Sequence, residues 1–322
     1  MKDTSFAFAD SQIRAIEGSL LNQSKFEALV SAKDIKSALD LLISFGYSSP
    51  DGEYNAEEIL KDAEKNAFEQ TKSLLNDENL IGLITAPNDF QNLKAAVKAL
   101  LISAKDIPYI YPTLLDTEKL YGILSDKSYD ELPLNFGEYA RLAYECAVNS
   151  ADGQLIDCML DKFYLEYLLS IARKSDNEFI KKYIAFSVNT SLIKIAYRAS
   201  LSDKNYNFIY DALVSTDEIN AELLASSAAK GSENLLSFIQ NSEFAFSAEL
   251  LKQNGDLFEK EIENRLIGLL KETSLISFGP EPVLAFYFAK MNEIKNIRIL
   301  LTCKEYNLPE EKIKERMREL YV

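Results

Sequence analysis

The chain has no histidine and no tryptophan, and only three of its 322 residues are cysteines. The absence of histidine removes the commonest general base, the Ser–His and Cys–His nucleophile pairs and the usual zinc-site chemistry. An enzyme is therefore disfavoured, although carboxylates or lysines could still act in catalysis. The cysteines Cys146, Cys158 and Cys303 show no CxxC spacing. Their odd number and this lack of pairing predict free thiols in a reducing compartment.

Long hydrophobic runs are also missing. The best apolar stretch, VLAFYFA, covers only residues 283–289, whereas roughly 18 to 20 residues are needed to span a bilayer. The N-terminus has no charged region followed by a long apolar run, so we expect no secretory signal. These features predict a cytoplasmic protein without direct transmembrane insertion.

Positive charge is scarce relative to negative charge. The chain has 35 Lys and Arg against 50 Asp and Glu, which gives a formal net charge of −15. This charge repels phosphate-coated partners, so we expect no nucleic-acid binding and no direct attachment to anionic lipid heads. A glycine-rich phosphate loop of the Walker type is absent from the sequence, and no cofactor is expected. A protein partner, or a locally basic patch on an acidic body, is compatible with this charge.

What the sequence does contain is helical periodicity. In SAKDIKSALDLLISFG, apolar residues recur every three or four positions, and Gly46 provides a natural helix stop. Period-two alternation is scarce, and an Asn-Gly hairpin signal occurs only at residues 254–255. The pattern therefore predicts an all-α fold.

One helix pattern occurs three times. NDFQNLKAAVKALL begins at Asn88, NTSLIKIAYRASL at Asn189 and EIKNIRILLTCK at Glu293. The copies are spaced by 100 and 104 residues, and another amphipathic helix precedes each of them. This period is far longer than the roughly 34 to 47 residues of common helical solenoids. It predicts three similar helical domains instead of a stacked array.

The expected domains cover residues 1–107, 108–205 and 206–322. The first boundary is placed at the prolines of DIPYIYP, which covers residues 106–112. Three similar units joined in tandem can close around a pseudo-threefold axis and leave a socket in the middle.

The C-terminal string FGPEPVLAFYFAKMNEIKNIRILLTCKEYNLPEEKIKERMRELYV resembles the closing segment of the C subunit of V-type (also called A-type) rotary ATPases. The eukaryotic counterpart is the d subunit of the vacuolar proton ATPase. The matching positions are Gly279, Pro280, Glu281, Pro282, Glu293, Asn296, Arg298, Lys304, Pro309, Arg316, Tyr321 and Val322. The opening FAFADSQIRAIEGSLLNQSKFEALV, DFQNLK at 89–94 and LDKFYLEYLL at 160–169 resemble the same family. Two positions depart from these patterns. The second copy has Leu192 where the first and third copies have Asn92 and Asn296. Cys303 stands where the family pattern predicts a small residue.

The resemblance implies three similar all-helical domains in a pseudo-threefold, funnel-shaped arrangement, without a nucleotide site. It also implies a non-catalytic central-stalk subunit on the cytoplasmic face of the membrane proteolipid ring. Such a subunit receives the central shaft in its socket and transmits torque. The expected partners are therefore the shaft subunits and the proteolipid ring, with the chain peripheral to the membrane through the ring. A general helical scaffold or adaptor, and an enzyme using carboxylates in a helical bundle, are the alternatives.

Basic residues of the repeat are the candidates for partner contact. Lys94, Lys194 and Arg298 follow the second apolar position of each copy, with Lys98 and Arg198 one turn further on. They could line the socket and contact an acidic shaft, or they could be solvated residues that complement the helix dipole. The basic segment at 312–320 is open to the same two interpretations, as a partner contact or as a solvated helix.

Polar residues of the repeat are candidates for a structural role. We expect Asn92 and Asn296 to tie neighbouring helices through buried hydrogen bonds. Asp89 and Glu293, with Asn189 between them in the series, are expected to stabilise helix N-termini. Glu293 and Lys304 also belong to the C-terminal signature of the family.

Overall fold

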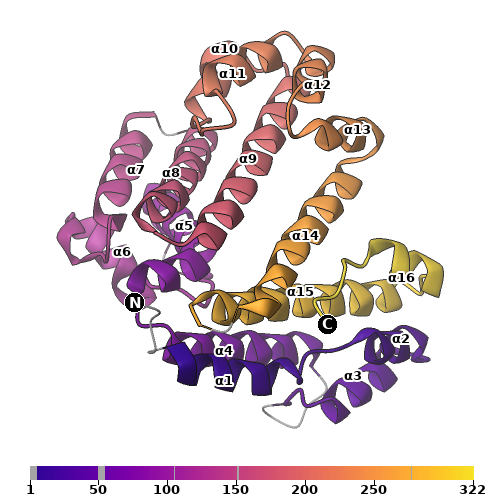
Figure 1. The fold of residues 1–322 in the computed structure, drawn as a ribbon. Coiled ribbons are helices and arrows are strands. Elements are labelled where there is room, and N and C mark those ends of the chain that lie inside the picture. Colours follow the sequence, from indigo (N-terminus) through magenta and orange to yellow (C-terminus); the bar gives the residue numbers. More distant parts are fainter. Residues whose placement is uncertain (1–5, 50–54, 105, 151, 277) are drawn as a thin grey trace. The chain divides into compact units, whose positions relative to one another are not determined.

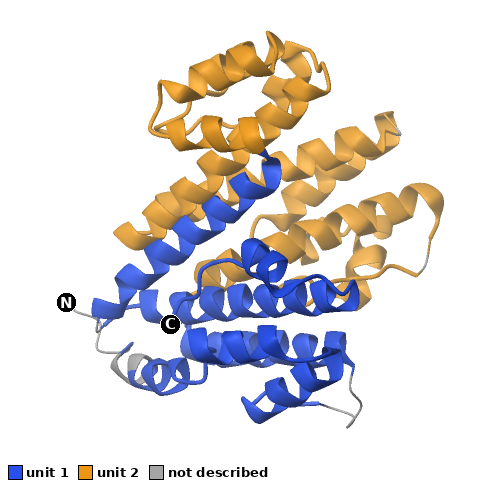
Figure 2. Cartoon of the chain, turned by 90° about the vertical axis from the view of Figure 1, so that its right-hand side faces the viewer, with its two compact units in different colours: residues 1–76, 254–322 blue, residues 77–253 orange. Residues whose placement is uncertain are grey.

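A computed structural model describes residues 6–49, 55–104, 106–150, 152–276 and 278–322. Every regular element in this part of the chain is a helix, which confirms the predicted all-α fold. The chain divides into two compact units, Met1–Asn76 with Asn254–Val322 (unit 1) and Asp77–Gln253 (unit 2). Figure 2 colours these two units.

Unit 1 combines the two ends of the sequence. Its helices are α1 (Phe6–Glu17), α2 (Gln23–Ser31), α3 (Ile35–Ser44), α4 (Ala56–Leu74), α14 (Gly255–Glu272), the 3-10 turn η2 (Thr273–Leu275), α15 (Glu281–Glu305) and α16 (Glu310–Arg316). Helix α15 lies along α4 and also packs on α1, α3, α14 and α16. The core joins residues of α2 to α4 with residues of α15 and α16, among them Phe26, Leu42, Ile297, Leu300 and Ile313.

Unit 2 contains the middle of the sequence. Its helices are α5 (Glu78–Ile102), α6 (Thr117–Asp126), the 3-10 turn η1 (Tyr129–Glu131), α7 (Phe136–Ser150), α8 (Gly153–Lys174), α9 (Glu178–Leu201), α10 (Tyr206–Asp211), α11 (Ala221–Ala229), α12 (Ser232–Gln240) and α13 (Ala245–Gln253). Helix α8 packs against α5, α7 and α9. Between α5, α7 and α8, the ring of Phe90 lies 5.2 Å from Phe136 and 5.8 Å from Tyr167, centroid to centroid. Such aromatic contacts fasten the three helices together.

The long helices begin at side chains that accept a backbone N–H. Asn55 caps α4, Asp77 caps α5, Asp152 caps α8, Asn177 caps α9 and Asn254 caps α14. The single Asn-Gly pair, at residues 254–255, therefore starts a helix and does not form a hairpin turn. Residue Gly46 ends α3 in the left-handed region, at φ +103°, as the sequence predicts.

The division into three domains at residues 107 and 205 remains a prediction. Packing within each unit joins helices of different repeats, because α5 of the first copy lies on α8 of the second. In unit 1, α15 of the third copy lies on α4 of the first. The three cysteines are free thiols, with Cys303 buried.

Candidate functional site

The three copies of the repeated helix carry a buried polar residue at the same position. Asp89, Asn189 and Glu293 are each less than 5% exposed and lie inside α5, α9 and α15. They are not N-terminal caps, so that prediction was wrong. Each of these helices begins more than ten residues earlier, and α5 even continues through Pro87.

Asp89 holds the loop that follows α5, and Asn189 holds the loop between α10 and α11. The Asp89 Oδ1 atom accepts hydrogen bonds from the Thr113 hydroxyl and from the backbone N–H of Leu114, the latter at 2.7 Å. The Asn189 side chain accepts from the Thr216 hydroxyl at 2.6 Å and donates to Glu218 at 3.0 Å. Burial raises the pKa of Asp89 above its ordinary value, against the opposing effect of these hydrogen bonds.

Glu293 is the centre of a buried polar cluster in unit 1. Its carboxylate accepts from the backbone N–H of Leu21, from the Tyr47 hydroxyl at 2.6 Å and from Lys290 at 2.6 Å. The side chains of Lys290 and Glu293 are only 13% and 5% exposed. Burial, followed by the nearby Glu293 charge, raises the pKa of Tyr47, so this hydroxyl stays protonated and donates. All the partners are internal, and the cluster therefore joins the N-terminal segment to α15.

Asn92 and Asn296 hold extended chain segments. The Asn92 side chain donates to the carbonyl of Ile110 at 2.8 Å and accepts from its N–H at 2.7 Å. The Asn296 side chain makes the same two bonds to Arg318, at 3.2 and 2.8 Å. The predicted structural role is in keeping with these contacts, but the partner is an extended backbone and not a neighbouring helix.

The basic residues of α5 contact acids of α8. Lys94 forms an ion pair with Asp161, and Lys98 lies 2.6 Å from Asp157. The Lys94 side chain is only 14% exposed, whereas that of Lys98 is 40% exposed. These amines are therefore engaged within the chain.

Arg298 makes the corresponding contacts in unit 1. Its guanidinium lies 3.3 Å from Glu57 and 3.2 Å from Glu64, both on α4. When the upstream helices are aligned as LDKFYLEYLLSIA and AEKNAFEQTKSLL, Glu64 falls on Asp161. The pair Arg298–Glu64 is thus equivalent to the pair Lys94–Asp161. In each case a basic residue of one copy binds the acid that precedes the next copy in cyclic order.

The other predicted residues lie elsewhere. On α9, Lys194 is half-buried and Arg198 is exposed. On α15, Lys304 donates to the carbonyls of Val30 and Ala32 at 2.8 and 2.6 Å, at the C-terminal end of α2. Burial lowers the pKa of Lys304, but the amine still complements the carbonyl end of that helix. A contact of the five basic residues with a partner remains a prediction.

A groove in unit 1 is the best candidate for an external contact. It has a volume of about 740 Å³ and lies between α14, α15 and the chain around the end of α16. We call it the basic groove. Its lining residues are Asn254, Asp256, Leu257, Lys260, Lys295, Arg298, Ile299, Thr302, Cys303, Glu315, Arg316 and Arg318.

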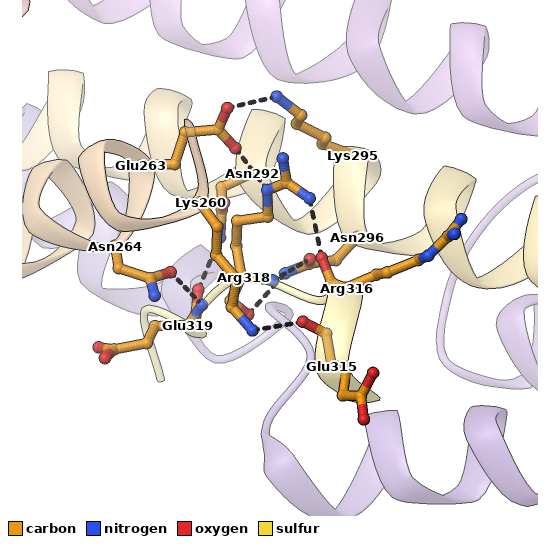
Figure 3. Close-up of polar contacts among 10 residues, drawn as sticks. All are labelled: Lys260, Glu263, Asn264, Asn292, Lys295, Asn296, Glu315, Arg316, Arg318 and Glu319. Atoms are coloured by element: carbon orange, nitrogen blue, oxygen red, sulfur yellow. Dashed lines mark hydrogen bonds and ion pairs between the residues drawn. The ribbon is translucent and has the colours of Figure 1, made fainter. Parts of the chain in front are cut away.

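One wall of the basic groove is built by the last residues of the chain. Helix α16 ends at Arg316, so the expected helix through residue 320 was wrong, and residues 317–322 form an extended C-terminal strap. The strap is held by Asn296 and by Asn264, whose side chain accepts from the N–H of Glu319 at 2.8 Å (Figure 3). Lys260 fixes the end of α16 by donating to the carbonyl of Glu315 at 2.7 Å.

The cations of the basic groove are not equally neutralised. Glu263 binds both Lys295, at 2.6 Å, and Arg318, at 2.7 Å. Lys260 donates to a neutral carbonyl, and Arg316 forms no ion pair with any described residue. Figure 3 shows the side chain of Arg316 extending away from the other residues drawn. A positive charge therefore remains available on an otherwise acidic chain.

Sequence reasoning identified only part of this groove. Segment 312–320 and Arg298 were candidates, whereas Lys260 and Lys295 were not. The charge density of KIKERMREL was the available signal. Among the described residues, no group of three or more metal-ligating side chains is found. In the same part of the chain, no helix combines the length and apolar character needed to cross a membrane.

The chain matches one protein family along most of its length. The sequence model described as ATP synthase (C/AC39) subunit matches residues 9–316. The chain belongs to this family. The match runs through both compact units, so the (C/AC39) subunit family accounts for the whole fold and not for one part of it.

Individual relatives in the (C/AC39) subunit family match over nearly their full length. The chain is 27% identical to the C subunit of the V-type sodium ATPase of Enterococcus hirae, over 96% of this chain and 97% of that protein. It is 22% identical to the C subunit of the A-type ATP synthase of Pyrococcus horikoshii, over 99% and 92%. The C subunit of the A-type ATP synthase of Methanocaldococcus jannaschii is also 22% identical, over 96% and 85%. The resemblance found in the sequence is thus confirmed.

Proposed function

We propose that this chain is a non-catalytic central-stalk subunit of a V/A-type rotary ATPase. It couples the rotating shaft to the membrane proteolipid ring during ATP-driven ion transport or ATP synthesis. The observation that carries the proposal is the family match over residues 9–316, together with relatives named as C subunits of V-type and A-type enzymes. The chain would lie on the cytoplasmic face of the membrane, held there by the ring.

The internal contacts suit a part that transmits torque. The buried polar residues of the repeats are used to fasten loops and extended segments to long helices, as at Asn92 and Asn296. Ion pairs tie one copy to the next, as at Lys94–Asp161 and Arg298–Glu64. Such contacts restrict sliding between helices, because interiors packed at native density deform little.

A closed arrangement of three similar domains is part of the same proposal. The equivalence of the two ion pairs supports it, because the third copy contacts the helix that precedes the first. In such an arrangement the shaft would enter the central socket, and helix ends at one side would contact the ring.

Co-purification tests the proposal. The chain would be expressed together with the shaft subunits and the proteolipid ring, and the assemblies analysed by native mass spectrometry. One copy that joins both the shaft and the ring is the expected result. A folded monomer that binds neither would contradict the proposal and return the function to a general helical scaffold.

A further inference from the structure

The basic groove of unit 1 has the properties of a docking site for a protein segment. Its volume of about 740 Å³ is within the range of about 300 to 1,000 Å³ that is typical of binding pockets. The walls come from the N-terminal part of α14, from α15 and from the end of α16. The polar contacts drawn in Figure 3 hold these three parts together without an external ligand.

The groove gathers basic side chains on an acidic chain. Five cations line it, at Lys260, Lys295, Arg298, Arg316 and Arg318, together with the carboxylates of Asp256 and Glu315. Three of the five are paired within the chain, Lys295 and Arg318 with Glu263 and Arg298 with Glu57 and Glu64. The formal net charge of the whole chain is −15. Because Glu315 already binds Lys312 at 2.7 Å, it is partly neutralised. An acidic group entering the groove would therefore pair first with Arg316 and Lys260.

Apolar surface lies beside these cations. Leu257 is 41% exposed, Ile299 is half-buried, and both line the groove with the buried Cys303. A site of this composition fits a segment with carboxylates on one side and an aliphatic side chain on the other. An amphipathic acidic helix or turn has this chemistry, whereas a free phosphate would leave the apolar surface in water.

We infer that the basic groove binds an acidic, amphipathic segment of a shaft subunit. The inference rests on the proposed function and adds the place and the chemistry of the contact. A nucleic acid or an anionic bilayer is a poorer occupant, because each extends beyond the groove over a chain whose formal net charge is −15. Repulsion there acts over a Debye length of about 8 Å at physiological salt.

The test measures the affinity of the purified chain for the purified shaft subunits. Arg316→Glu removes the cation that lacks an ion pair, and Leu257→Asp places a charge on the apolar surface. The matched control is Lys314→Glu, an exposed residue of α16 outside the groove lining, with the same change in net charge as Arg316→Glu. We expect each groove variant to weaken shaft binding by about tenfold, and the control by less than about twofold. Higher salt should weaken the wild type more than Arg316→Glu.

The possible outcomes separate the inference from the proposed function. If the wild type binds the shaft and both groove variants bind equally well, the groove is not the contact, while the proposed function stands. If the wild type does not bind the shaft, the proposed function and the inference both fail. Vesicles that contain phosphatidylglycerol form a further arm. Binding to them that is lost in Arg316→Glu, without an effect on shaft binding, would assign the groove to lipid and overturn the inference.

Discussion

Asn92 and Asn296, in different units of the chain, make the same pair of hydrogen bonds to the backbone of one later residue. Each side-chain amide donates to a carbonyl and accepts from an N–H, 18 residues on in one case and 22 in the other. The backbone N–H and C=O groups of a segment that belongs to no sheet or helix obtain hydrogen-bond partners in this way. The contact is therefore shared by the first and third copies of the repeat, whereas Leu192 occupies the position in the second copy.

Asn296→Leu should lower stability. Leucine fits at the equivalent position in the middle repeat, where Leu192 is buried, so the main loss is that of the hydrogen bonds to Arg318. We expect a cost of about 1 to 3 kcal/mol, and each kcal/mol lowers the melting temperature by about 2 to 4 °C. Thermal unfolding, followed by circular dichroism, measures the melting temperatures of the wild type and the variant. An unchanged melting temperature with failure to join the shaft would contradict the structural role.

Glu293→Gln should destabilise unit 1 because it leaves Lys290 without its anion. Removal of one partner of a buried pair costs about 3 to 5 kcal/mol. The double variant Glu293→Gln with Lys290→Met removes both charges, and we expect it to recover part of this loss. Urea unfolding of the wild type, both single variants and the double variant gives the coupling energy. Additive losses would show that the ion pair does not contribute.

Asp89 should make stability dependent on pH. Its folded pKa is raised above the ordinary value of 3.8, so the folded chain keeps a proton that the unfolded chain has released. The contribution of this carboxyl is fully present below the unfolded pKa and is lost as pH rises through the folded pKa. Asp89→Asn, which copies Asn189 in the second repeat, should flatten this slope and should not lower stability near pH 7. Urea midpoints between pH 4 and 8 test this, and an equal slope in both proteins would contradict it.

Arg298 should contribute to stability mainly through its ion pairs with Glu57 and Glu64 of α4. The Arg298, Glu57 and Glu64 side chains are 43%, 51% and 23% exposed, so we expect Arg298→Glu to cost about 1 kcal/mol. The swap Arg298→Glu with Glu64→Arg should restore most of that loss in urea unfolding. Shaft affinity of the swapped protein then separates the two roles. Restored stability with lost affinity would place Arg298 in the partner contact, whereas restored affinity would limit it to the fold.

The sequence predicted the helical class and the repeated helix but not where that helix begins. The segment before Asp89, from Leu80 to Ala86, is buried at every position, and so it shows no amphipathic period. Pro87 follows it and indicates a break, although α5 continues. A helix start near Asn88 was therefore inferred, and Asp89 was taken for a cap.

The candidate site was predictable only where neighbours in sequence are neighbours in space. Asn296 was predicted to be structural, but its partner Arg318 was not predicted, because the strap does not continue α16. The proximity of Lys260 to the end of α16 depends on packing between distant segments, and a pattern of charge along the chain does not contain that information. The buried ion pair of Glu293 with Lys290 gave no signal beyond two common residue types at helical spacing.

The composition of unit 1 from both ends of the sequence also sets the order in which the two units can fold during translation. Its core packs Phe26 and Leu42 against Ile297 and Leu300, so the N-terminal helices leave the ribosome long before their packing partner exists. At about 5 to 20 residues per second, translation of unit 2 takes roughly 10 to 35 seconds. Unit 2 can fold during this time, while the apolar faces of the first helices stay exposed to water. A truncated transcript that stops before α15 would therefore yield one folded unit and an aggregation-prone N-terminal tail.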